Sequence, residues 1–295
     1  MTDRAAREMG LQPGTPVTAG TVDSIAEAIS IGAIHPGDLA VTFGTTTYFV
    51  QVMDRSLFNE TMWHSAYFRP GLYLMEGGTS ATGGMTRWFR DNFARKEMEI
   101  ERAGGENAYA VLTKEAARVP PGSQGLIVLP YLSGERTPIN DPMARGVIYG
   151  LTLGHGRGHI YRAVLEATAY AVAHNLEILR AAGSMPQRII GVGGMTRSPL
   201  LMQIVSDVTG VELLLPEKTI GACYGDCFLA GLAAGLFDLD ELETSWVKPA
   251  ACYQLNDDSH QKYQPTYQAY KELYLLTKDN MHHLAKLDSG NTKTG

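Results

Sequence analysis

The sequence has 295 residues, enough for one large domain or two small ones with a substantial buried core. Its net charge is −6 and Lys and Arg do not cluster, which argues against nucleic acid as a partner. The longest apolar run, residues 227–237, is shorter than the roughly 20 residues of a transmembrane helix, and no secretory signal begins the chain. A cytoplasmic protein without a membrane segment is therefore expected.

The residue pattern in the first part of the chain predicts a frayed helix at 1–10, a short strand at 17–19 and a short helix after Asp23. Two β-rich runs follow, at 39–43 and 48–52. Gly44, Thr45, Thr46 and Thr47 separate these runs, which predicts a hairpin with glycine at its corner. The middle of the chain alternates strands and helices, which we expect at 72–76 (strand), 82–93 (helix), 106–117 (helix), 126–129 (strand), 147–151 (strand) and 158–182 (helix).

The segment from 188 to 215 predicts a strand, a glycine turn, a helix and a second strand. A β-branched run ends at Gly193 and Gly194, and Ser198 followed by Pro199 is typical of a helix start. Gly210 is expected to end that helix. Such a turn lets backbone approach a ligand closely, and the helix start offers unpaired N–H groups to an anion or a ribose. The other interpretation is that the glycines only permit a tight turn.

The last part of the chain predicts a small-residue helix at 225–236, then a surface-packed helix with several tyrosines and a disordered tail from Asp288. The order of elements indicates a mixed α/β fold. Cys223, Cys227 and Cys252 lack zinc-ligand spacing and are expected to be reduced core thiols. No metal site is predicted.

Asp23 is the leading candidate for a catalytic base. Backbone donors at a helix start favour its ionised form, which can accept the proton of an attacking hydroxyl. The alternative is that Asp23 only caps the helix.

Other candidate residues lie at glycine-rich turns. The Gly44–Thr47 corner offers backbone N–H groups and hydroxyls to phosphate oxygens, and Gly83 with Arg87 pairs a glycine-rich entry with a helix. Each of these features also occurs as an ordinary turn or a solvated helix face. Glu135 and Arg136 are expected to form a local ion pair.

Together these segments resemble the FGGY family of carbohydrate kinases. The strongest match is the run from Gly146 to Leu151 followed, after seven residues, by the run from His159 to Glu166, which satisfies a family signature pattern at every position. The run from Pro130 to Pro138 looks especially like that of xylulokinases. The resemblance covers residues 11–237. It implies an actin-like, ribonuclease-H-like fold, with a mixed sheet and helices on both faces, that binds ATP and Mg²⁺.

The resemblance also implies roles for individual residues. Asp23 matches the base that activates the sugar hydroxyl, and Thr45, with Gly44 and Thr46, matches the second phosphate hairpin. Gly83 matches a glycine beside the nucleotide, and Arg87 stands where glycerol kinases have glutamine. The adenosine loop corresponds to Gly193, Gly194, Met195 and Ser198.

One family feature is absent from the sequence: no Asp-x-Gly-Thr phosphate hairpin, which belongs to the first kinase domain, occurs in it. The expected organisation is therefore a leader and remnant of that domain at 1–36, an ATP-binding domain at 37–287 and a tail at 288–295. The predicted function is ATP-dependent phosphorylation of a pentulose such as xylulose or a related sugar. The chain is expected to be inactive without a first domain in cis or trans, and a homodimer is left open. The alternative is a non-catalytic nucleotide-binding module.

Overall fold

A computed structural model describes residues 1–291, with side chains as far as residue 287. Within this range seven strands form one mixed sheet in the order β3-β4-β2-β1-β7-β8-β9, and β5 pairs with β6 in a small second sheet. The strands are β1 (Asp38–Phe43), β2 (Thr47–Met53), β3 (Trp63–Ala66), β4 (Tyr73–Gly78), β5 (Ile127–Leu129), β6 (Val147–Tyr149), β7 (Arg188–Val192), β8 (Glu212–Pro216) and β9 (Pro249–Tyr253).

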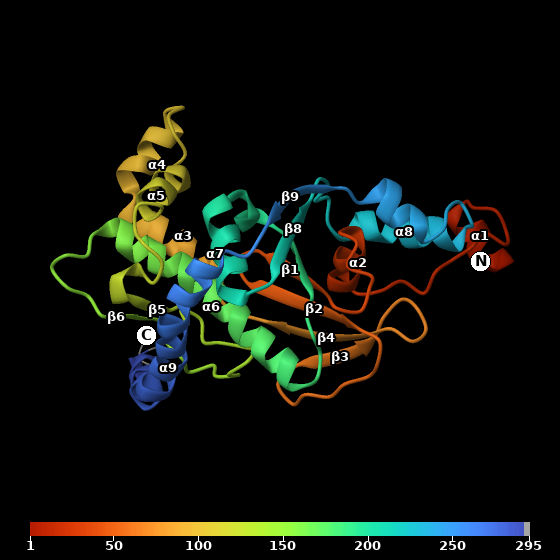
Figure 1. Ribbon diagram of the computed structural model, residues 1–295. Coiled ribbons are helices and arrows are strands. Elements are labelled where there is room, and N and C mark those ends of the chain that lie inside the picture. The colour runs from red at the N-terminus through yellow and green to blue at the C-terminus, as the bar shows by residue number, and fades with distance from the viewer. Residues whose placement is uncertain (292–295) are drawn as a thin grey trace.

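Helices cover both faces of the large sheet, as predicted (Figure 1). The α-helices are α1 (Asp3–Met9), α2 (Asp23–Ser30), α3 (Thr82–Phe93), α4 (Arg95–Arg102), α5 (Ala108–Ala116), α6 (Arg157–Ala181), α7 (Pro199–Thr209), α8 (Ala222–Ala233) and α9 (Asp257–Asn291). Shorter helical turns are η1 (Ser123–Gly125), η2 (Gly194–Arg197) and η3 (Leu242–Trp246).

Alternating side chains of the central strands divide the core between the two faces. Leu39, Val41 and Phe43 of β1 pack with the helices α3, α5, α6, α7 and α9, whereas Ala40 of β1 and Val192 of β7 pack with α2 and α8. Such a two-residue period is what a strand buried on both faces requires. The parallel pairing of β1 with β7 brings their carboxyl ends to the same edge.

Several sequence predictions are wrong in detail. Residues 17–19 form no strand, and Cys223, Cys227 and Cys252 are free but exposed rather than buried in the core. The cysteines at 223 and 227 lie on α8, and a helix built almost entirely of small and apolar residues does not indicate which side faces the core. Of the predicted tail, the backbone of 288–291 continues α9, and residues 292–295 lie outside the described residues.

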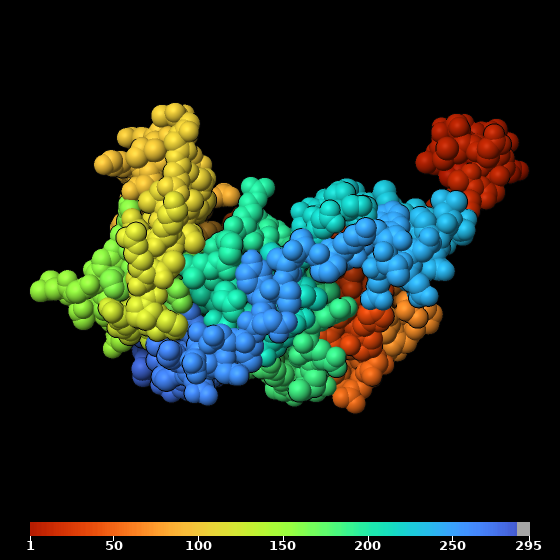
Figure 2. Space-filling view, turned by 45° about the horizontal axis from the view of Figure 1, so that its top comes forward, coloured from red at the N-terminus to blue at the C-terminus, as the bar shows by residue number. Residues whose placement is uncertain are grey.

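Within the described residues, no helix is both long and apolar enough to cross a lipid bilayer. The helix α1 stands apart from the body of the molecule, at the opposite end from α9 (Figures 1 and 2).

Candidate functional site

Three glycine-containing bends meet at the edge of the sheet where β1 and β7 end. A Cβ atom on Gly83, in the first turn of α3, would lie 1.9 Å from the carbonyl oxygen of Gly44 and 2.8 Å from Met195 Sδ. A Cβ atom on Gly193 would lie 2.5 Å from the carbonyl oxygen of Phe43, and Gly193 has a φ of +105°. Backbone therefore touches backbone here in a way that only glycine permits.

A cavity of about 830 Å³ opens beside these bends, a volume within the usual range for small-molecule sites. Its walls come from the end of β1, from α3, α5 and α6, and from the η2–α7 segment. The molecular surface is hollowed between the column of α4 and α5 and the body that contains α7 (Figure 2).

Most of the predicted binding residues line this cavity, and three do not. Those that line it are Gly44, Thr45, Gly83, Arg87, Gly194, Met195 and Ser198. Thr46 and Gly193 belong to the same two bends without lining the cavity, and Asp23 lies elsewhere, at the start of α2.

The hairpin tip is fixed to α3 by hydrogen bonds. The N–H of Gly84 donates to the carbonyl oxygen of Thr45 at 2.9 Å. Beneath the tip, buried threonine hydroxyls bond to one another, with 2.7 Å between Thr47 Oγ1 and Thr82 Oγ1 and 3.0 Å between Thr79 Oγ1 and Thr82 Oγ1. The side chain of Thr45 is left exposed, so its hydroxyl is available to a ligand.

The start of α7 has the predicted geometry. Ser198 occupies the N-cap position, and its Oγ accepts a hydrogen bond from the N–H of Leu201 at 3.4 Å. Pro199 is the first helical residue and Gly210 ends the helix in the left-handed conformation. The helix therefore begins at the cavity wall, with its positive dipole end toward the ligand space.

Several cavity residues were not predicted from the sequence: Arg90, Asn107, Tyr109, Thr113 and Arg197. Arg90 follows Arg87 by three residues, a spacing that puts both on one face of α3 and could have indicated it. Its guanidinium lies 4.8 Å from the centre of the Tyr109 ring, a cation–π contact between α3 and α5. Arg87 and Arg197 are exposed, so the cavity carries positive charge at its mouth.

Asp23 starts α2, which packs on the face of the sheet opposite the cavity. Glu27, one helical turn later in α2, accepts a hydrogen bond from Thr42 Oγ1 of β1 at 2.8 Å. Ser24, next to Asp23, donates from Oγ to Glu76 Oε2 of β4 at 3.4 Å, so the start of α2 lies beside β4. The side chain of Asp23 is exposed, and Val22 rather than Asp23 occupies the N-cap position. The interpretation of Asp23 as a simple N-cap is therefore wrong.

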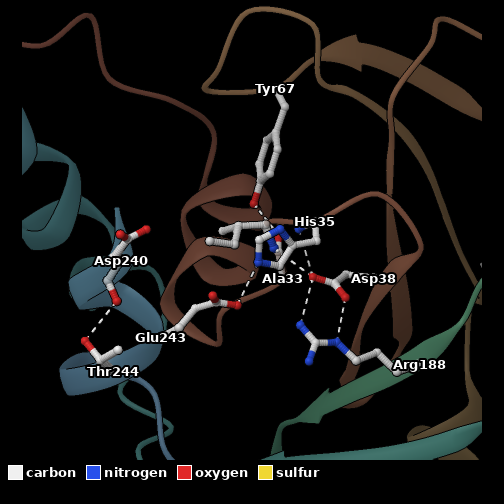
Figure 3. Close-up of polar contacts among 9 residues, drawn as sticks. Ala33, His35, Asp38, Tyr67, Arg188, Asp240, Glu243 and Thr244 are labelled. Atoms are coloured by element: carbon white, nitrogen blue, oxygen red, sulfur yellow. Dashed lines mark hydrogen bonds and ion pairs between the residues drawn. The ribbon is translucent and has the colours of Figure 1, made fainter. Parts of the chain in front are cut away.

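A partly buried ion pair between Arg188 and the buried Asp38 links the chain after α2 to the sheet (Figure 3). Both carboxylate oxygens of Asp38 accept from the guanidinium of Arg188, at 2.6 and 3.2 Å, and Asp38 Oδ2 also accepts from the N–H groups of Ile34 and His35. His35 Nε2 lies 2.7 Å from Glu243 Oε1. These contacts hold the connection between α2 and β1, and with it the position of Asp23.

Among the residues that the structure describes, no group of three or more His, Cys, Asp or Glu side chains is placed to hold a metal ion.

The structure replaces the predicted ion pair between Glu135 and Arg136 with other contacts. Glu135 Oε1 accepts from the backbone N–H groups of Ser80 and Arg136, at 2.6 and 2.8 Å, and the Arg136 guanidinium donates to the carbonyl oxygen of Thr79.

Comparison with known proteins gives consistent matches. Residues 39–234 match the model of the FGGY family of carbohydrate kinases, C-terminal domain. A gluconokinase from Bacillus subtilis is 32% identical over 97% of this chain and 56% of its own length, and a xylulose kinase from the same organism is 28% identical over 93% and 54%. The crystal structure of xylulose kinase from Rhodospirillum rubrum superposes with a TM-score of 0.86 at 31% identity, covering 96% of this chain and 56% of that one. The chain thus spans about half the length of these relatives, and their fold confirms the predicted fold class.

Proposed function

This chain belongs to the FGGY family of carbohydrate kinases, and from that premise we propose that it is the ATP-binding part of an enzyme that phosphorylates a sugar hydroxyl. The observation that carries the proposal is the meeting of Gly44, Gly83 and the Gly193–Gly194 bend around one cavity of about 830 Å³. Close backbone approach and exposed N–H groups are what a nucleotide phosphate chain requires.

Each bend beside the cavity is proposed to bind a different part of the nucleotide. In the proposal Gly44, Thr45 and Thr46 hold phosphate oxygens through backbone N–H groups and hydroxyls. Gly83 and Arg87 of α3 flank the nucleotide, and Gly193, Gly194, Met195 and Ser198 hold the adenosine. Thr45 and Arg87 support this arrangement because both are exposed within the cavity lining, where they can bond to a ligand.

Asp23 is the proposed catalytic base. An exposed carboxylate at a helix start can accept the proton of the attacking sugar hydroxyl. Mg²⁺ binds mainly to substrate phosphates with few protein carboxylates, so it would arrive on ATP and neutralise charge on the phosphates.

The substrate is proposed to be a pentulose such as xylulose or a related sugar acid or polyol. The residues that select it would lie mainly in a first kinase domain supplied in cis or trans, because this chain spans about half of its relatives. Without that domain one phosphate hairpin and the sugar site are missing, and positioning dominates phosphoryl transfer. We therefore infer nucleotide binding without turnover by this chain alone, in the cytoplasm, where ATP is available.

The test is a coupled kinase assay on the purified chain, with xylulose, gluconate and glycerol as acceptors. The assay is run with and without the separately expressed first domain of a gluconokinase or xylulose kinase. The expected result is ADP binding but no turnover by the chain alone, turnover after the first domain is added, and loss of at least a thousandfold in rate in Asp23→Asn. Asp3→Asn is the matched control, because Asp3 is likewise the first residue of a helix.

Sugar-dependent turnover by the chain alone would contradict the proposed incompetence, and full activity of Asp23→Asn would contradict the role of Asp23. Nucleotide binding that never supports turnover would instead support a non-catalytic module on the same fold. Light scattering on the assayed sample reports whether a homodimer forms.

A further inference from the structure

Three consecutive side chains, Glu135, Arg136 and Thr137, bind three consecutive backbone residues, Gly78, Thr79 and Ser80. Glu135 Oε1 accepts from the N–H of Ser80 at 2.6 Å, and the Arg136 guanidinium donates to the carbonyl oxygen of Thr79 at 2.8 Å. Thr137 Oγ1 accepts from the N–H of Gly78 at 2.8 Å. This is one-to-one pairing of a side-chain triplet with a backbone triplet, and we call residues 135–137 the clamp.

The clamped residues lead directly into the nucleotide cavity. Gly78 ends β4, and the chain then enters α3 at Thr82, one residue before Gly83. Gly83 is the residue whose missing Cβ lets α3 lie against the carbonyl oxygen of Gly44. A small displacement of residues 78–80 would therefore move Gly83 relative to the hairpin.

The clamp is itself fixed to the core on two sides. Thr137 Oγ1 lies 2.7 Å from Asn175 Oδ1 of α6, and Asn175 Nδ2 donates to the carbonyl oxygen of Thr137. Glu135 and Asp141 exchange two backbone hydrogen bonds of 2.8 Å, which close the loop between them. The clamp thus has a rigid base from which to hold residues 78–80.

Glu135 is the member of the clamp whose burial costs the most free energy, because its carboxyl group is only partly hydrogen-bonded. Its side chain is 5% exposed, and its Oε2 has no hydrogen-bond partner among the described residues. Burial raises the pKa of Glu135 to about 7, although hydrogen bonds from the N–H groups of Arg136 and Ser80 oppose the shift. An apolar side chain here would leave the N–H of Ser80 without this acceptor, so the contact to Ser80 is the feature that the carboxyl group adds.

We propose that the clamp sets the position of Gly83 at the nucleotide cavity, and that Glu135 is a positioning residue for nucleotide binding. This inference rests on the proposed function, since it needs a nucleotide in that cavity. Oε1 can accept from Ser80 whether or not Glu135 is protonated, so an amide can replace the carboxyl group here. A side chain of the same size without an acceptor cannot.

The experiment compares ADP affinity by calorimetry in the wild-type chain, Glu135→Gln and Glu135→Leu. Amide exchange at Ser80 is measured in the same proteins without nucleotide. We expect Glu135→Leu to lower ADP affinity about tenfold and to speed Ser80 exchange by at least tenfold, with Glu135→Gln within threefold of wild type on both. Arg136→Met, at an exposed position that tolerates the change, is expected to lower affinity about threefold, and it keeps the test decisive if Glu135→Leu does not fold.

Asp207→Leu is the matched control for general destabilisation. Asp207 is also a buried carboxylate that accepts from a backbone N–H, that of Asn256 at 3.0 Å, but it holds the start of α9 instead of residues 78–80. It is expected to lower the melting temperature without changing ADP affinity.

Three results would overturn the proposal, and they separate its failure from that of the proposed function. Wild-type ADP binding with unchanged affinity in Glu135→Leu and Arg136→Met rejects the clamp alone. An equal loss of affinity in Asp207→Leu shows that the effect is loss of stability and not positioning. Absence of ADP binding by the folded wild-type chain rejects the proposed function, and the clamp's role in it falls too.

Discussion

The folded protein lowers the pKa of two ionisable residues, His174 and Asp141, for different physical reasons. His174 of α6 is largely surrounded by protein, and burial lowers its pKa to about 4, with Lys271 adding to the shift and Glu177 opposing it. Asp141 is also buried, but hydrogen bonds from His282, Tyr274 and the N–H of Met143 outweigh burial and leave its pKa below the usual value. The two residues therefore respond to acid in different pH windows.

His174 predicts a loss of stability in mild acid. The unfolded chain binds a proton at this residue below about pH 6.5, whereas the folded chain resists protonation until about pH 4, so stability is full above pH 6.5 and falls as the pH drops between these values. Between pH 7 and pH 5 the loss assigned to this residue is about 2 kcal/mol. Urea unfolding at both pH values should show that difference between wild type and His174→Gln. An identical pH dependence in the two proteins would contradict the prediction.

Residues at the cavity were predictable where close backbone contact requires glycine. Gly44, Gly83 and Gly194 stand at strand ends or helix starts, and glycine there has a local reason that sequence reveals. Tyr109 was missed because its contact with Arg90 joins α5 to α3, and no local pattern states which helices are neighbours, whereas the spacing of Arg90 from Arg87 was a local signal that went unused. The Glu135–Arg136 ion pair was wrong for the same reason, since residues 78–80 compete for both side chains.

At the scale of elements, strong local signals gave accurate boundaries. The helix predicted at 82–93 is α3, and the hairpin and the strand–turn–helix–strand unit form where expected. The strands β3 and β9 and the helix α4 were not predicted. Both strands lie at edges of the sheet and are largely exposed, so they lack the alternation of apolar residues that marks a half-buried strand. The helix α4 buries no residue and so carries no apolar stripe to read.

The carboxylate of Asp141 bonds to two side chains in the second half of the helix α9. Asp141 Oδ2 accepts from Tyr274 OH at 2.8 Å and lies 2.7 Å from His282 Nε2. We predict that Asp141→Ala, which leaves both partners without that acceptor, lowers the free energy of unfolding by roughly 3 kcal/mol. Amide exchange in the second half of α9 should rise before that in its first half, which Tyr263 and Tyr267 hold by burial.

Glu177→Ala is the control for α9, because the pair of Lys271 and Glu177 is partly exposed and its loss should cost less than about 1 kcal/mol. Uniform exchange along α9 in Asp141→Ala, or stability equal to that of wild type, would show that the helix is held by apolar packing alone.

At the scale of the whole molecule, the cavity and Asp23 lie on opposite faces of the sheet. The proposed nucleotide cavity lies among α3, α5, α6 and α7, whereas Asp23 starts α2, which packs with α8 on the other face. The hairpin tip at Gly44 and Thr45, which lines the cavity, follows β1 at the edge of the sheet where β1 and β7 end. In the proposed enzyme, the first domain would bring the sugar hydroxyl to the phosphate chain at this edge.

The central claim is that the glycine bends at this edge form a nucleotide site, and calorimetric titration of the chain with ADP and Mg²⁺ tests it most directly. Gly83→Ala puts a methyl group 1.9 Å from a backbone oxygen, whereas Gly84→Ala, the neighbouring residue in the same helix, has ordinary contacts from 3.6 Å. We predict that wild type and Gly84→Ala bind ADP with equal affinity and that Gly83→Ala binds at least tenfold more weakly while remaining folded. ADP binding of wild-type affinity by Gly83→Ala would contradict it.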